Sequence, residues 1–135
     1  MDFFVFTSFP VLVAWSVALL VFHVLVQAQF ARREFGTEWN TGPRDKSQKP
    51  KGLIAGRADR ASQNFRETYP AFVALALGLA IADPASGLGH AGALLWFLAR
   101  LSYIPLYLAG IAYVRSAAWG VAMLGLLAMF LALVL

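Results

Sequence analysis

The chain lacks cysteine and holds few charged residues, and both shortages narrow what it can do. None of its 135 residues is cysteine, which excludes disulfides, thiolate-bound metals and a thiol nucleophile supplied by the protein. It has two histidines, and neither has a second at the i+3 or i+4 spacing of a helical metal site, so we expect no bound metal. Charged residues make up 13% of the chain, whereas about 25% is usual in a soluble domain.

Apolar residues are abundant instead, at 60% of the chain, and they gather in long runs. A helix needs about 20 apolar residues to cross a bilayer. The pattern predicts an all-α fold, a four-transmembrane-helix bundle in one domain over residues 1–135. The expected helices cover 3–30, 55–82, 91–113 and 116–135, with a polar loop at 31–54 and a tight turn at Val114-Arg115-Ser116.

The positive charge is concentrated in one part of the chain. Nine of the eleven lysines and arginines lie between Arg32 and Arg66, and the net charge is +4. Loops on the cytoplasmic side of membrane proteins are rich in Lys and Arg, so we interpret this cluster as a topology signal rather than a nucleic-acid site. We expect a multi-pass protein of a bacterial inner membrane or its equivalent. The 31–54 loop and Arg115 would then face the cytoplasm.

Polar side chains form a stripe at the start of the second predicted span. Arg57, Arg60, Asn64 and Glu67 follow at i, i+3, i+7 and i+10, which places them within about 80° of one another on a helix. Such groups are expensive in lipid and mark functional sites by default. Two guanidiniums, an amide and a carboxylate suit a small zwitterionic or carboxylate-bearing ligand. The alternative is that the arginines only extend their charged groups to the membrane surface, while Asn64 and Glu67 make structural contacts between helices.

The third span carries a matching stripe of Arg100, Tyr103 and Tyr107 at i, i+3 and i+7. Because a carboxylate at membrane depth needs a cation, we expect Glu67 to pair with Arg100, either as part of a site or as a structural bridge. The tyrosines offer phenol donors or pack in the core. Arg115 is either an arginine of a cytoplasmic loop, where positive residues are common, or a cation that stabilises a developing negative charge.

These residues, in this order, resemble a known family, the membrane-associated proteins in eicosanoid and glutathione metabolism (MAPEG). The motif Arg57-Ala-Asp-Arg60-Ala-Ser-Gln-Asn64-Phe-Arg-Glu67-Thr-Tyr-Pro70 is similar to the family's signature in its second helix. Ala31-Arg32-Arg33 resembles the end of its first helix, and Ala99-Arg100-Leu-Ser-Tyr103 with Tyr107 and Arg115 resembles the third helix and the turn after it. Where Gln63 stands, some members carry another arginine.

The resemblance implies a homotrimer that binds glutathione between subunits. The ligand-binding residues that it implies are Arg60, Asn64, Glu67, Tyr103 and Tyr107, with Arg32 (or Arg33) reaching a ligand carboxylate from the adjacent helix. We also expect Arg57 and Arg100, the other members of the two stripes, to bind the ligand. Arg115 is the implied catalytic residue, activating the glutathione thiol. The expected function is a glutathione-dependent transferase or peroxidase for lipophilic electrophiles or lipid hydroperoxides that enter from the lipid bilayer. The alternative is a non-catalytic membrane scaffold that binds a partner, and a small transporter is a third reading.

Overall fold

The fold is all-α, as the sequence predicts. A computed structural model of the chain describes residues 7–43, 45 and 48–135, and no strand occurs among them. Its helices are α2 (Phe9–Phe35), α3 (Thr37–Thr41), α4 (Leu53–Ala82), α5 (Gly87–Ala109) and α6 (Ala112–Val134). The four long helices are each long and apolar enough to cross a membrane, whereas α3 has 5 residues.

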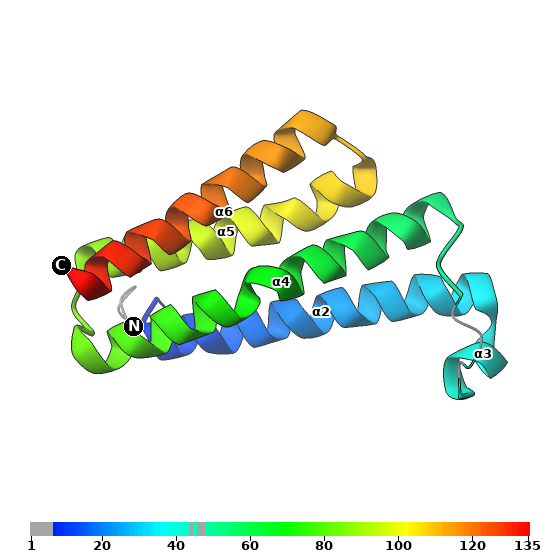
Figure 1. Cartoon of the computed structure of the whole chain (residues 1–135), viewed down its shortest axis with the longest axis horizontal. Coiled ribbons are helices and arrows are strands. Elements are labelled where there is room, and N and C mark those ends of the chain that lie inside the picture. Colours follow the sequence, from blue (N-terminus) through cyan, green and yellow to red (C-terminus); the bar gives the residue numbers. More distant parts are fainter. Residues whose placement is uncertain (1–6, 44, 46–47) are drawn as a thin grey trace.

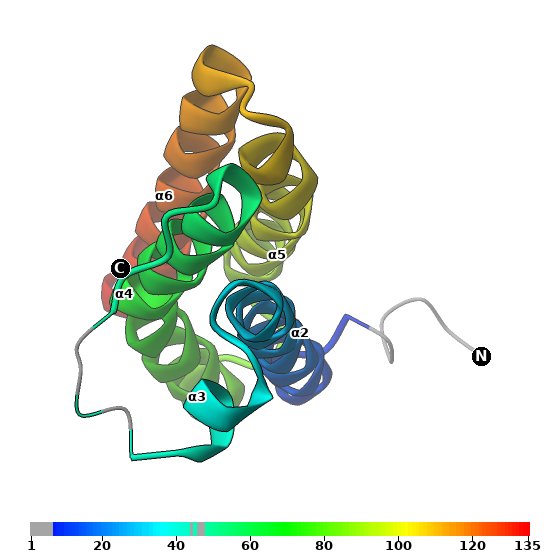
Figure 2. The ribbon, with the colours of Figure 1, turned by 90° about the vertical axis from the view of Figure 1, so that its right-hand side faces the viewer.

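The long helices run side by side along one axis, so the bundle has two distinct ends (Figure 1). Helix α3 and the α5–α6 turn lie at one end, and the α4–α5 turn and the C-terminus lie at the other. Seen down the axis, the four helices surround a shared core (Figure 2). The first turns of α4 and α6 and the last turn of α5 therefore meet at the α3 end.

Helix ends follow local chemistry. Pro10 lies in the first turn of α2, where its missing N–H costs nothing, and the Ser86 side chain accepts a hydrogen bond from the Gly89 N–H at 3.2 Å to cap α5. Glu34, in the last turn of α2, accepts the backbone N–H groups of Lys51 and Gly52 just before α4. This carboxylate ties the polar loop back to α2, which continues beyond the predicted helix end at residue 30 to Phe35.

The predicted turn at Val114-Arg115-Ser116 is wrong, because these residues lie in the first turns of α6. Helix α5 ends earlier, at Gly110, whose φ of 75° is the left-handed conformation that commonly ends helices. Its N–H bonds the carbonyl of Tyr107 at 3.1 Å. Three residues without a glycine could not make this turn as readily, and the correction moves Arg115 from a loop onto a helix.

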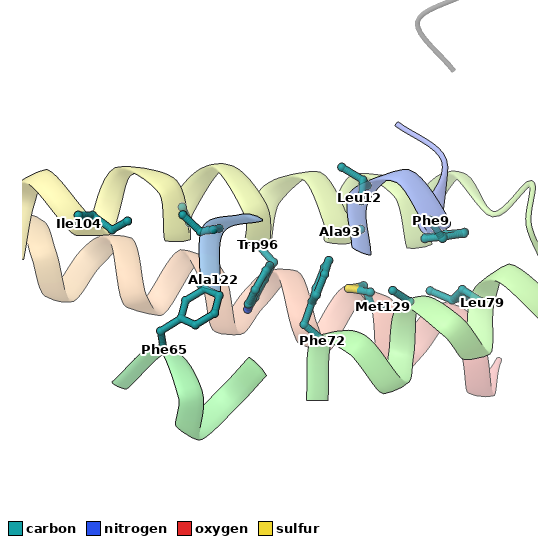
Figure 3. Packing of buried hydrophobic residues seen from close by; sticks show 13 residues of the cluster. Phe9, Leu12, Phe65, Phe72, Leu79, Ala93, Trp96, Ile104, Ala122 and Met129 are labelled. Carbon is teal, nitrogen blue, oxygen red and sulfur yellow. The ribbon is translucent and has the colours of Figure 1, made fainter. Parts of the chain in front are cut away.

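Aromatic packing forms the centre of the bundle. The Phe72 and Trp96 rings stack with centroids 3.9 Å apart and planes 10° from parallel, which joins α4 to α5 (Figure 3). Phe65 and Met129, both fully buried, extend the same cluster along α4 and α6. Removing a large buried side chain from such a core costs about 3–5 kcal/mol.

Helices α5 and α6 touch through their backbones. A Cβ on Gly92 would lie 2.6 Å from the Gly125 carbonyl oxygen, and a Cβ on Gly125 would lie 2.6 Å from the Gly92 carbonyl oxygen. Two facing glycines permit this contact, as small residues do in other membrane helix pairs. The contact holds α6 in a fixed position relative to α5, so the first turns of α6 stand opposite the last turns of α5.

Candidate functional site

A polar cavity of about 420 Å³ lies between α4, α5 and α6, lined by residues from the first half of α4, the second half of α5 and the first turns of α6. Its lining residues are Arg60, Gln63, Asn64, Glu67, Tyr103, Tyr107, Arg115, Ser116 and Trp119. The volume lies within the range of about 300–1,000 Å³ that is typical of small-molecule sites. Six of the nine predicted site residues line this one cavity.

Helix α4 supplies one wall. Arg60, Asn64 and Glu67 share a helix face, and all three line the cavity. Arg57, the fourth member of the predicted stripe, does not line it. Its Nη1 donates a hydrogen bond to the Leu108 carbonyl oxygen at 3.0 Å, and its guanidinium lies against Gly110. Arg57 thus satisfies a free carbonyl at the end of α5, a structural use that the helical spacing alone does not reveal.

Tyrosines from α5 form the second wall, and α6 brings a cation to it. Arg60 Nε donates to the Tyr107 hydroxyl oxygen at 3.2 Å. The Tyr107 oxygen is therefore an acceptor for Arg60, and its own O–H remains available as a donor. The guanidinium carbon of Arg115 stands 4.6 Å from the centre of the Tyr107 ring, a cation–π distance. Tyr103 packs against Tyr107 with centroids 5.4 Å apart.

Arg100 is the main departure from the sequence prediction. It is fully buried and does not line the cavity, and the predicted Glu67–Arg100 ion pair is not formed. Its Nη1 instead donates to Asn64 Oδ1 at 2.8 Å. Glu67 is exposed, and drawing its carboxylate into the core would remove its hydration, which an amide oxygen loses at much lower cost.

Arg32 does not reach the cavity of its own chain. It lies in the last turn of α2, exposed, and is absent from the lining. Within one chain, α2 does not place Arg32 at the cavity wall that α4, α5 and α6 form. Its predicted contact with the ligand stays a prediction that requires a neighbouring subunit.

Three lining residues were not predicted as ligand contacts: Gln63, Ser116 and Trp119. The signal for them was present. Gln63 lies at i+3 from Arg60 and at i−4 from Glu67, and Trp119 follows Arg115 at i+4, so each shares a helix face with a predicted residue. Ser116 donates its hydroxyl hydrogen to the Ala112 carbonyl at 3.1 Å, which leaves its oxygen to act toward the cavity only as an acceptor.

Hydrogen-bond donors therefore predominate in the lining of the cavity. Arginine, phenol and amide donors occupy most of its wall, and Glu67 is the one carboxylate among the lining residues. Arginine recognises carboxylates with paired hydrogen bonds, and a carboxylate recognises an ammonium group. The arrangement suits a ligand that carries more than one negative group and a single positive group.

The comparison with known protein families agrees with this architecture. The family model of the MAPEG family matches residues 12–135, nearly the whole chain, so the protein belongs to the MAPEG family. Members of the family include glutathione-dependent transferases and peroxidases as well as non-catalytic proteins. No curated protein and no solved structure matches the chain. With four long apolar helices and this family membership, the chain is an integral, multi-pass membrane protein.

Proposed function

We propose that this protein binds glutathione in the cavity between α4, α5 and α6 and joins its sulfur to lipophilic electrophiles. The observation that carries the proposal is the common cavity of Arg60, Asn64, Glu67, Tyr103, Tyr107 and Arg115. Glutathione has two carboxylates, one ammonium group and one thiol. The carboxylates match the arginine and amide donors, and the ammonium group matches Glu67. The absence of cysteine is consistent with this chemistry, because the substrate supplies the sulfur.

Arg115 is the proposed catalytic residue. Its guanidinium lies beside Tyr107 on the cavity wall and is always charged, so it would favour the thiolate over the thiol. Ser116, next to it on α6, donates its proton to a backbone carbonyl and so has no hydrogen to offer the sulfur. With an aryl halide, the thiolate would form the carbon–sulfur bond, halide would leave with its electron pair, and the thiol proton would pass to water.

The same site would also support peroxidase chemistry. Two molecules of glutathione reduce one hydroperoxide, breaking its O–O bond and yielding an alcohol, water and glutathione disulfide. The protein would contribute orientation and thiolate stabilisation to both reactions, which converts a slow bimolecular encounter into a positioned one. The second substrate is lipophilic in this proposal, because the exposed faces of the four helices are apolar and membrane-spanning.

We further propose that the active form is a homotrimer with glutathione bound between subunits and the 31–54 loop in the cytoplasm. Arg32 supports this assembly, because it is exposed and lies outside the cavity of its own chain. In the proposed trimer, Arg32 of the neighbouring subunit would supply the missing guanidinium. Native mass spectrometry of the purified protein in detergent tests the assembly.

The test of the function is glutathione binding, followed through the ultraviolet difference absorption of the thiolate, together with conjugation of a generic aryl halide. Wild-type protein should give a thiolate signal with glutathione and no such signal with S-methylglutathione, which has no ionisable sulfur but should compete for the site. Absence of binding at millimolar glutathione would contradict the proposal and favour a non-catalytic membrane scaffold.

A further inference from the structure

A fully buried arginine stands directly behind the cavity wall. Arg100 donates from Nη1 to Asn64 Oδ1 at 2.8 Å, and Asn64 lines the cavity while Arg100 does not. Arginine carries hydrogen-bond donors only. The atom of Asn64 that faces it must therefore be the amide oxygen. Because the amide is planar, its NH₂ group points away from Arg100 when the oxygen is held there.

We propose that Arg100 is a positioning residue that holds the Asn64 amide with its oxygen inward and its NH₂ group toward the cavity. Asn64 is then a fixed donor, and this part of the wall selects an acceptor, a carboxylate or a carbonyl, on the ligand. The inference rests on the proposed function, in which that acceptor belongs to glutathione. Asn64 would then bind an acceptor group of the ligand, whereas Glu67 would bind its ammonium group.

The geometry around Arg100 suits this task. Its guanidinium carbon lies 5.3 Å from the Phe65 ring centre and 4.7 Å from the Tyr103 ring centre, so aromatic rings hold it in place. Two of its nitrogens, Nε and Nη2, have no hydrogen-bond partner in the described part of the chain. Neither does Nε2 of His23, whose ring also packs against Phe65.

A buried cation with unused donors is a poor way to stabilise a fold, because its desolvation is not offset by a carboxylate. A well-packed apolar side chain of similar length would hold the helices together at least as well. An apolar residue could not make the directed hydrogen bond to Asn64, and because Asn64 lines the cavity, this bond points to the ligand rather than to the fold.

Asn64→Asp separates orientation from packing. The new carboxylate keeps an oxygen on Arg100 and turns a second oxygen, an acceptor, toward the cavity. We expect the variant to melt above the wild-type temperature in detergent, since it gains an ion pair with Arg100, and to raise the Kd for glutathione at least about tenfold. Gln63→Glu is the matched control, because it adds the same charge to the lining without a contact to Arg100. It should raise the Kd several-fold less.

Arg100→Met releases the amide. We expect the Kd for glutathione to rise about tenfold while kcat at saturating glutathione stays near the wild-type value. Combined with Asn64→Leu, it should add nothing to the affinity already lost by Asn64→Leu alone. Wild-type affinity in Asn64→Asp, equal losses in Asn64→Asp and Gln63→Glu, or additive losses in the double variant would each overturn the assignment.

A second measurement needs no ligand. Asn64→Asp should raise the melting temperature in the wild-type background and lose that gain in the Arg100→Met background. The same shift in both backgrounds would overturn the orientation. Failure of the wild type to bind glutathione would overturn the proposed function, while the melting temperatures would still decide whether Arg100 orients Asn64.

Discussion

Replacing Arg115 with alanine should separate turnover from binding. Arg115 is half-buried, and its guanidinium carbon makes a 4.6 Å cation–π approach to the Tyr107 ring. Such a contact contributes about 0.5–1 kcal/mol at an exposed site, so the free energy of unfolding should fall by about 1 kcal/mol or less. Losing a group that stabilises a developing anion costs about 2.7–4 kcal/mol of activation free energy, or about 10²–10³ in kcat.

The assay combines glutathione titration, followed by thiolate absorption and by calorimetry, with steady-state conjugation of an aryl halide. In Arg115→Ala, we expect the thiolate signal and kcat to collapse while the calorimetric Kd changes by less than about threefold, since other residues hold the carboxylates and the ammonium group. Arg115→Lys should keep part of the turnover because it keeps a charge. Arg66→Ala is the control, because that exposed arginine bonds the Ser62 carbonyl of its own helix and stands outside the cavity.

A loss of affinity as large as the loss of kcat would refute this reasoning. It would mean that Arg115 grips glutathione equally in the ground state and the transition state, which is binding without activation. An equal loss of turnover in Arg66→Ala would refute it in a different way. It would show that a cation outside the cavity raises kcat just as much, through the long-range electrostatic potential of the protein.

Three further predictions concern the other walls of the site and the helices that support it. Glu67→Gln should raise the Kd for glutathione about 10–100-fold, and an analogue without the amino group should bind the variant and the wild type equally. Gly125→Ala should lower the free energy of unfolding by about 1–3 kcal/mol, because its Cβ would lie 2.6 Å from the Gly92 carbonyl oxygen. Gly120→Ala, in the same helix, should not lower it, because no atom lies within 4 Å of the added Cβ. Thermal melting in detergent compares the two variants. Arg57→Met should lower the free energy of unfolding by about 1.5–3 kcal/mol, and with it the melting temperature, because the Leu108 carbonyl loses its charged donor. An unchanged melting temperature would contradict that role of Arg57.

Much of the candidate site could be predicted before the fold was known. Arg60, Asn64 and Glu67 share a face because helical periodicity is local, and the same holds for Tyr103 and Tyr107. The composition also predicted four long apolar helices, since the length of a span depends on the bilayer rather than on neighbouring helices. What these patterns could not supply was the partner of each polar group, because a partner on another helix depends on how the two helices are rotated against each other.

Arg57 and Arg100 illustrate that limit. Both belong to the predicted stripes by spacing, yet neither lines the cavity. Arg57 faces the end of α5 and bonds the Leu108 carbonyl, which became available to it only because α5 ends at Gly110. Arg100 meets Asn64 rather than Glu67, because the approach of α4 to α5 brings the amide oxygen to the buried guanidinium and leaves the carboxylate exposed.

The sequence by itself determined the class of the protein, its four membrane-length helices and the polar faces of two of them, because composition and periodicity act along the chain. Only the tertiary structure decided which polar groups share a cavity and which serve the fold. The backbone contact of Gly92 with Gly125 sets α6 beside α5, and that placement brings Arg115 to Tyr107. Hydrogen bonds and cation–π contacts act over a few ångströms, so their partners depend on packing distances that no one-dimensional pattern contains.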